Sequence, residues 1–287
     1  MAEAGKKKDA GTRMRDLLRV GKGFALLDVD TSATPGFDGG KSAGKRALAE
    51  GEKPLADLQE RLFAEARGGG ERSLLLLIQG MDTSGKGGIM RHVVGAVDPQ
   101  GVDLTAFKKP TEEELEHSFL WRVRNALPRP GQIGVFDRSH YEDVLVARVH
   151  GDVPEKVWRA RYDEINEFEA DVVAGGTPIV KVMLHISAGE QKQRLLRRLD
   201  RPDKHWKFDP GDLDEREHWE AYQAAYQDAL TSCSTEPAPW YVVPADRKWY
   251  ARLAVQHLLL GALRDMDPKW PVADFDVEAE RARLLAT

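Results

Sequence analysis

A glycine-rich segment with one lysine is the clearest sign of chemistry in this sequence. Residues 80–87 read GMDTSGKG, a G-x-x-x-x-G-K pattern that contains Gly85 and Lys86. The short apolar run Leu74–Ile78 precedes it and suits a buried strand, and a helix-like stretch follows. Glycines let such a turn point its N–H groups inward, while the lysine and the helix N-terminus add positive charge. This segment, the phosphate loop, is therefore predicted to bind phosphate.

One position departs from the usual pattern. The Ser or Thr that normally follows the lysine, and whose hydroxyl binds Mg²⁺, is replaced by Gly87. Asp82 inside the loop can take this role, because Mg²⁺ prefers hard oxygen ligands. The alternative is a glycine-rich turn between a strand and a helix with an incidental lysine.

A second acidic position lies at the end of another apolar run. Asp137 directly follows Ile133–Phe136, and an aspartate in this place forms the second half of a phosphate–Mg²⁺ site. The alternative is a helix N-cap, with Asp137 or Ser139 capping residues 141–149. The phosphate loop elsewhere in the chain favours the metal interpretation. A hydrolase triad on Ser139 is set aside, because no nucleophile-elbow motif surrounds it.

Arginines recur at helical spacing in residues 191–207. Arg194, Arg198 and Arg201 stand at i, i+4 and i+7 and share one face of a predicted helix. Such a run is usually a solvated face. Few acids neutralise it here, and phosphoryl transfer uses mobile arginines to balance transition-state charge. A helical lid over the phosphate site is therefore predicted.

The elements that must position these residues are strands alternating with helices. The predicted strands are Leu74–Ile78, Val102–Phe107, Ile133–Phe136, Ile179–Ile186 and Trp240–Val243. Long helices are predicted over about 41–66, which Gly51 and Pro54 can bend or split, and over 154–174. Another runs from a capping box at Thr111 to Pro128. Alternation implies a parallel sheet between helical layers, with ligands beyond the carboxyl ends of the strands.

Composition limits the classes of function. The chain has 287 residues, of which 41% are hydrophobic and 31% charged, as in ordinary globular proteins. The single cysteine, Cys233, excludes an internal disulfide and suits a reducing compartment. No secretory signal and no apolar run of membrane-spanning length is visible, so we expect a cytoplasmic location without membrane partners. A net charge of −5 argues against nucleic-acid coating but allows a polyanion in a local basic groove.

Five separated motifs together resemble the polyphosphate kinase 2 family, and the resemblance runs from about Asp28 to about Leu263. The motifs are GMDTSGKGG (Gly80–Gly88), FKKPTEEELEHSFLWR (Phe107–Arg122), VFDRSHYEDVLVARV (Val135–Val149), RLLRRLDRPDKHWKF (Arg194–Phe208) and STEPAPWYVVPADRKWY (Ser234–Tyr250). They occur in the order that the family has.

The resemblance implies an α/β fold, a P-loop kinase-like three-layer sandwich with a parallel sheet and a helical lid. Residues 1–287 would form one domain, with a flexible tail over 1–27, a helical extension over 28–70 and a lid over 187–235. It also implies reversible transfer of a phosphoryl group from inorganic polyphosphate to a nucleoside mono- or diphosphate (AMP or ADP, with GMP or GDP as further candidates). Mg²⁺, or Mn²⁺ in its place, would be the cofactor, and the protein would be a homo-oligomer, dimer or tetramer.

The resemblance also assigns residues by position. For catalysis these are Asp82 and Asp137, which organise the metal, Lys86 and Arg138, which contact phosphates, and Arg194 and Arg198, which close the lid over the transferring group. For substrate binding they are Gly80, Gly85 and Gly87 of the loop, Phe107, Pro110 and Thr111 beside the acceptor nucleotide, Lys108 and Lys109 on a polyphosphate track, and Tyr141, Glu142, Arg201 and Lys204. From the residues alone, Phe107, Trp121 and Tyr141 suit either base stacking or the core. The wording of residues 139–143 is most similar to family members that accept both AMP and ADP.

Direct in-line transfer without a phospho-enzyme is the predicted mechanism, because the acceptor phosphate is already ionised near neutral pH. Two other functions stay open at this point. One is a nucleoside monophosphate kinase that uses ATP on the same fold, and the other is a non-enzymatic polyphosphate-binding protein. The N-terminal helix and the helix over 154–174 are candidates for contacts between subunits.

Overall fold

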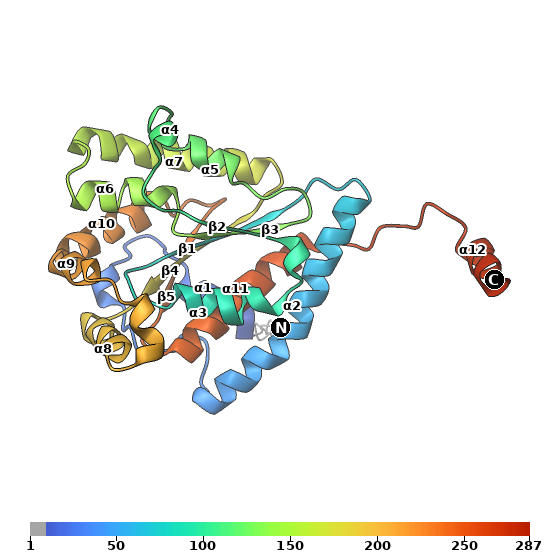
Figure 1. Cartoon of the computed structure of the whole chain (residues 1–287), viewed down its shortest axis with the longest axis horizontal. Helices are drawn as coiled ribbons and strands as arrows, with labels where there is room; N and C mark the ends of the chain where they lie inside the picture. Colours follow the sequence, from blue (N-terminus) through green and yellow to red (C-terminus); the bar gives the residue numbers. More distant parts are fainter. Residues whose placement is uncertain (1–9) are drawn as a thin grey trace, which may run out of the picture.

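All five predicted strands are present and form one parallel sheet in the computed structural model, which describes residues 10–287 (Figure 1). The strands are β1 (Leu74–Gln79), β2 (Val102–Ala106), β3 (Ile133–Asp137), β4 (Ile179–His185) and β5 (Trp240–Pro244). Their order is β2-β3-β1-β4-β5, so β1 lies in the centre. Ile78 pairs with Asp137 across β1 and β3. The phosphate loop after β1 therefore begins beside Asp137, as the alternation of strands and helices predicted.

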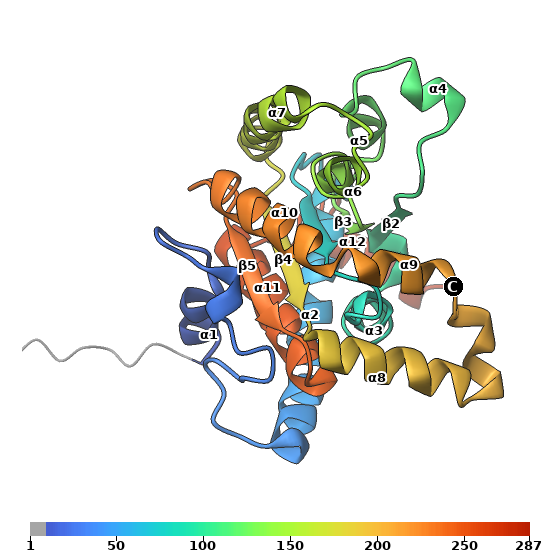
Figure 2. The same ribbon diagram turned by 90° about the vertical axis from the view of Figure 1, so that its left-hand side faces the viewer.

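Helices cover both faces of the sheet, and the alternation of side chains along β1 explains why. Leu74, Leu76 and Ile78 point into one apolar core, and Leu75 and Leu77 point into the cores on the opposite face. The first face is covered by α1 (Ala10–Leu18), α2 (Lys41–Arg67), α3 (Lys86–His92) and α11 (Lys248–Met266). The second is covered by α5 (Trp121–Asn125), α6 (Val146–Val149), α7 (Glu155–Ala174) and α10 (Trp219–Ser232), as Figures 1 and 2 show.

The long helix α2 runs without a break through Gly51 and Pro54. It packs along α11, where a side chain at Gly44 would collide with Trp249 and one at Gly51 with Gln256. The two glycines thus allow the close approach of the helices, and this packing outweighs the hydrogen bond that Pro54 removes. Although α11 is largely buried, no helix in the described chain combines the length and apolarity needed to cross a membrane.

The helix predicted from Thr111 to Pro128 is wrong as a single element. The capping box at Thr111 and Glu114 is present, but it starts only a short helix, α4 (Glu112–Leu115), which is followed by irregular chain and then α5. Leu115 is 69% exposed. The apolar spacing in the sequence therefore does not correspond to one buried helix face, because nothing apolar covers Leu115.

The expected flexible tail over residues 1–27 also needs correction in its second half. Met14 and Leu18 of α1 are buried against α11, and the amide of Val20 donates to the carbonyl of Trp240 at 2.8 Å. Leu26, in the short 3₁₀ turn η1 (Leu26–Asp28), is buried too. A few apolar residues at helical spacing are enough to fix this polar segment against the core. Residues 1–9 lie outside the described residues.

Three helical segments follow β4 and lie beside the phosphate loop. They are α8 (Ala188–Leu199), η5 (Pro202–Lys207) and α9 (Gly211–Glu217). The predicted lid region extended to residue 235, but α10 places Tyr222, Tyr226 and Leu230 in the core. We therefore use "lid segment" for residues 188–217 only. Beyond α11 the chain continues to α12 (Val277–Leu285), which lies well away from the body (Figure 1).

Candidate active site

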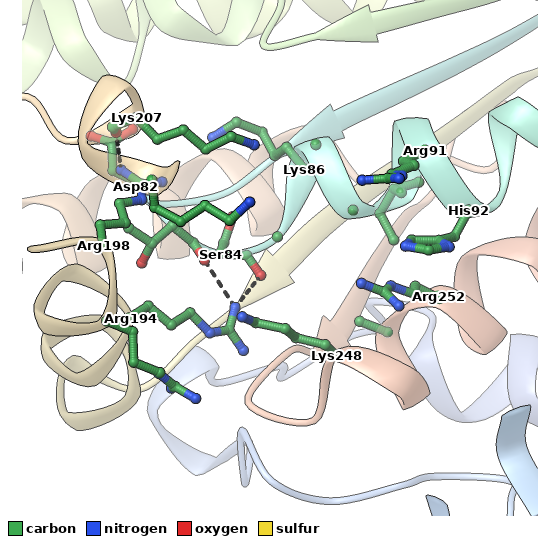
Figure 3. A pocket seen from close by; sticks show the side chains of 18 of the residues that line it. Asp82, Ser84, Lys86, Arg91, His92, Arg194, Arg198, Lys207, Lys248 and Arg252 are labelled. Atoms are coloured by element: carbon green, nitrogen blue, oxygen red, sulfur yellow. Dashed lines mark hydrogen bonds between the residues drawn. The ribbon is translucent and has the colours of Figure 1, made fainter. Parts of the chain in front are cut away.

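A cavity of about 510 Å³ lies between the phosphate loop, α8 and the start of α11 (Figure 3). Sequence-predicted residues that line it are Asp82, Gly85, Lys86, Gly87, Asp137, Arg194, Arg198, Arg201 and Lys204. Further basic side chains in its lining are Arg91, His92, Arg197, Lys207, Lys248 and Arg252. Asp82 and Asp137 are the acidic members of this lining. The cationic cavity, as we call it, therefore attracts polyanions strongly.

The phosphate loop has the conformation that its glycines predicted. Gly80 (φ +152°) and Gly85 (φ +124°) occupy backbone conformations that side chains disfavour, and a Cβ at Gly80 would lie 2.8 Å from the carbonyl oxygen of Leu184. Lys86 is the first residue of α3, and its Nζ donates to the carbonyl of Gly80 at 2.8 Å. Strand, turn and helix thus place the ammonium group over the loop, which confirms the predicted context of the motif.

Arg194 lies beneath the phosphate loop and is only 4% exposed. Its Nη1 donates to the carbonyls of Thr83 at 2.9 Å and Ser84 at 2.8 Å (Figure 3). Its Nη2 donates to the carbonyls of Ala245 at 2.6 Å and Asp246 at 3.0 Å.

The last N–H of Arg194, on Nε, donates to Glu190 at 2.8 Å, so all five N–H groups of the guanidinium are used. Thr83 has a positive φ of 63°, which is unfavourable for a threonine. Arg194 was predicted to close over the transferring group as part of a lid. In this structure Arg194 joins the strained loop to α8 and to the segment after β5, and its role at the transferring group stays a prediction.

The two aspartates fit a Mg²⁺ ion of the kind found in phosphoryl-transfer sites. Asp82 and Asp137 both line the cationic cavity, from the loop after β1 and from the end of β3. Within residues 10–287 no group of three His, Cys, Asp or Glu side chains forms a ready-made metal site. Mg²⁺ is usually bound through one or two carboxylates, substrate phosphates and water, so two carboxylates suffice. The predicted metal ligands are thus brought to one cavity.

Arg138 pairs with two acidic side chains of the site, Asp82 and Glu142. Its guanidinium lies 3.3 Å from Asp82 and 3.3 Å from Glu142, and its own φ is +64°. Burial opposes its charge, but Glu142 and Asp82 outweigh this and raise the pKa of Arg138. Burial raises the pKa of Glu142, and Arg138 offsets part of that rise.

Arg138, Glu142 and Asp82 also line a smaller hollow of about 110 Å³, together with Tyr222 and Tyr226. Asp82 therefore borders both this Arg138 hollow and the cationic cavity.

The arginines in the outer part of the lid segment have other partners than Arg194 and are less buried. Arg198 donates to the carbonyl of Lys207 at 2.7 Å and to Asp212 at 2.9 Å, so it ties α8 to α9. Arg201 and Lys204 both pair with Asp203, at 2.8 Å and 3.1 Å, and are much more exposed than Arg194. Exposed pairs of this kind are weak, so these cations are available to an incoming anion.

Several residues predicted to bind substrate do not line the cationic cavity. Phe107 is buried in edge-to-face contact with Phe136, with ring centroids 4.9 Å apart. Tyr141 is fully buried and donates its hydroxyl proton to Glu169 at 2.9 Å while accepting from Lys181. Both aromatic rings therefore belong to the core and are not available for base stacking.

The segment after β2 lies near Asp137 without lining the cationic cavity. The amide of Phe107 donates to the carbonyl of Asp137 at 3.0 Å, which places Lys108 and Lys109 just beyond the same edge of the sheet, both exposed. Pro110 leads into Thr111, whose side chain caps α4. These residues stay candidates for substrate contact at the rim.

The basic residues on the far side of the cavity were not predicted from the sequence. Lys248 and Arg252 come from the start of α11, and Arg91 and His92 from the end of α3. Burial, together with Arg194 and Arg197, lowers the pKa of Lys248 to about 8. A signal was available, because Lys248 follows the carboxyl end of β5 as Asp137 ends β3, and ligands bind at this edge of a parallel sheet.

Comparisons with known proteins show which family the chain is similar to. Residues 39–271 match the family described as Polyphosphate kinase 2 (PPK2). The AMP/ADP-polyphosphate phosphotransferase of Meiothermus ruber is 47% identical over 86% of this chain and 91% of its own, and the ADP-polyphosphate phosphotransferase of Rhodopseudomonas palustris is 42% identical over 80% and 82%. A crystal structure of polyphosphate kinase 2 from Arthrobacter aurescens superposes with a TM-score of 0.94 at 56% identity, covering 96% of this chain and 97% of that one.

Proposed function

Because the chain belongs to the polyphosphate kinase 2 family, we propose that it transfers the terminal phosphoryl group of inorganic polyphosphate to a nucleoside mono- or diphosphate. The observation that carries this proposal is the cationic cavity, where basic side chains from the phosphate loop, α3, the lid segment and α11 surround two aspartates. A linear polyphosphate carries about one negative charge per phosphate and needs an extended row of cations. A single ATP would need fewer, so the extent of the basic lining favours polyphosphate as the donor.

The two hollows that meet at Asp82 support an in-line reaction between two phosphate substrates. We place polyphosphate in the cationic cavity, with its terminal phosphoryl group near Lys86. The phosphate of the acceptor then lies toward Arg138, in the smaller hollow on the other side of Asp82. Lys86 and Arg138 neutralise the charge of the reacting phosphates, and the loop amides fix their orientation. Alignment and charge neutralisation suffice because an ionised acceptor phosphate needs no strong general base.

Asp82 and Asp137 would hold the Mg²⁺ ion, with Mn²⁺ as a substitute. When bound, this ion neutralises charge on the phosphate oxygens of the donor and acceptor. Cys233 is unsuited to forming a phospho-enzyme, since it is buried and burial raises its pKa to about 12. A stable phosphohistidine in protein incubated with polyphosphate would contradict direct transfer.

We propose that both AMP and ADP serve as acceptors. The Meiothermus relative carries both nucleotides in its name, and it is 47% identical over most of this chain. The Rhodopseudomonas relative is named for ADP and is 42% identical. The single buried cysteine further suits a reducing compartment, and we place the activity in the cytoplasm.

The deciding experiment supplies the purified protein with AMP or ADP, Mg²⁺ and polyphosphate in the absence of ATP. Chromatography should detect ADP and ATP as products, with polyphosphate shortening in step. Product from ATP and AMP alone, with none from polyphosphate, would instead identify an ATP-dependent nucleoside monophosphate kinase. Binding of polyphosphate without turnover would identify a binding protein.

A further inference from the structure

The C-terminal end of the chain leaves the body of the molecule as an ordered arm. Up to Pro271 the chain is still held on α2, because the amide of Lys269 donates to Glu65 at 3.1 Å and the Trp270 ring lies under Arg61. Every residue from Val272 to Thr287 is exposed. Figure 1 shows this C-terminal arm, residues 272–287, ending in α12 far from the sheet.

The C-terminal arm exposes several large apolar side chains among its charged ones. Its exposed apolar side chains are Val272 (94% exposed), Phe275, Val277, Leu284 and Leu285. α12 has nine residues, and its hydrogen bonds and ion pairs join residues of the arm to one another. An isolated helix shorter than about 12–15 residues is marginal in water. A large apolar surface on such a helix therefore indicates a binding partner.

A matching surface lies at the opposite edge of the sheet from the active site. It is a cavity of about 400 Å³ with an apolar floor that includes Ile179, Leu258 and Ala262. Its rim carries Arg15, Arg19 and Arg72. We call it the arginine-rimmed cavity.

The C-terminal arm and the arginine-rimmed cavity are complementary in charge and in the placing of apolar side chains. Residues 274–280 of the arm read DFDVEAE, in which four acids alternate with Phe275, Val277 and an alanine and no base occurs. The rim arginines pair with Asp265, Glu236 and Glu65, and each arginine side chain is roughly two-fifths exposed. Arg72 is held by two hydrogen bonds to Glu65, whereas the pairs of Arg15 and Arg19 are more exposed, and exposed ion pairs are weak. The acids of an incoming arm can therefore meet the rim while its apolar side chains fill the floor.

The position of the cavity suits a second copy of the chain as the partner. Met266 is the last residue of α11, a few residues before the arm, and it also lines the arginine-rimmed cavity. The root of the arm and the cavity are thus neighbours on one patch. A two-fold axis beside this patch would place the arm of each chain over the cavity of the other, which makes the contact reciprocal and closed.

We propose that the C-terminal arm is exchanged between two copies of this chain, with the segment around Phe275 and Val277 seated in the arginine-rimmed cavity of the partner. This surface includes Val173 at the end of α7, a helix that was predicted as a candidate for subunit contacts. It leaves the cationic cavity at the opposite edge of the sheet open to substrate.

The first test compares the molar mass of the full-length protein with that of an arm variant by analytical ultracentrifugation. F275D/V277D should halve the molar mass, whatever the size of the wild-type assembly. L27D is the matched control, because Leu27 is 83% exposed on η1, and it should leave the mass unchanged. An arm variant with wild-type mass, or a wild-type protein that is monomeric at its highest soluble concentration, would overturn the proposal.

The second test asks whose cavity the arm occupies. Chains carrying F275C are mixed with chains carrying A262C and treated with a short bismaleimide, while the buried Cys233 stays unreactive. A cross-linked dimer is expected, and F275C mixed with L27C should give none. If the doubly substituted chain F275C/A262C instead gives only an internally linked monomer, the arm folds back on its own body and the exchange is refuted.

Discussion

The lid segment carries arginines with different surroundings at two places: Arg194 within α8, which we call its root, and Arg201 just beyond the end of α8, which we call its tip. At the root, Arg194 is buried and donates all five of its N–H groups to the protein, four of them to backbone carbonyls. At the tip, Arg201 pairs with one exposed aspartate. Arg198 lies between them and ties α8 to α9. The lid segment therefore holds the phosphate loop in shape at its root and carries exposed positive charge at its tip.

Loss of either metal-site aspartate should lower kcat most, and this gives a reference for variants at the root and the tip. Replacing Asp137 by Asn should lower kcat by about 10³-fold, because several kcal/mol of metal-dependent charge stabilisation is lost. D82N should behave alike. Steady-state kinetics at saturating Mg²⁺, with thermal unfolding as the control for folding, measures the effect. Near-normal turnover of both variants would refute the metal assignment.

Substitution of Arg194 at the root of the lid segment should give the second largest loss of kcat. R194K keeps the charge but cannot make five hydrogen bonds, so Thr83 is released from its strained conformation and kcat should fall by about 10²-fold through misplacement of the loop. The double variant T83G/R194K should regain part of kcat, because glycine adopts a positive φ without strain. T83G alone serves as the control. Failure of this rescue would mean that Arg194 acts on the phosphate itself.

The tip should show a smaller effect of another kind. R201A/K204A removes two exposed cations, so the KM for long-chain polyphosphate should rise by roughly tenfold while kcat stays unchanged. The difference from wild type should shrink at high salt, since exposed charges are screened. Initial rates across polyphosphate and salt concentrations test this. A fall in kcat equal to that of R194K would erase the distinction between root and tip.

The smallest effect concerns Lys248, whose pKa is lowered by burial and by the nearby charges of Arg194 and Arg197. Because its pKa in the folded protein is about 8, Lys248 is charged below this pH and loses its charge as the pH rises through 8. Above pH 8, kcat/KM for polyphosphate should therefore decline by about fivefold, or roughly 1 kcal/mol. K248R should remove this limb, since arginine stays protonated. An unchanged pH profile in K248R would show that another group titrates.

Much of the fold could be predicted because its signals are local. A short apolar run between turns indicates a strand of a parallel sheet, and each of the five predicted segments is a strand, although β2 at the edge of the sheet is only partly buried. The helix expected over 111–127 was wrong, since spacing cannot reveal that no apolar surface covers Leu115. The polar segment 13–27 was misjudged for the opposite reason, because a surface on α11 and β5 was there to receive it.

The sequence by itself determined the chemistry of the site: a lysine-bearing glycine turn, two aspartates at strand ends and a run of arginines. These are local patterns, and the parallel sheet brings its strand ends to one edge whatever lies between them. Only the tertiary structure decided which of these side chains are free to meet a substrate. Arg194 and Tyr141 are indistinguishable from binding residues in the sequence, yet burial gives both of them protein partners. The reason is physical, since a buried polar group must be bonded within the protein, and its partners come from distant parts of the chain.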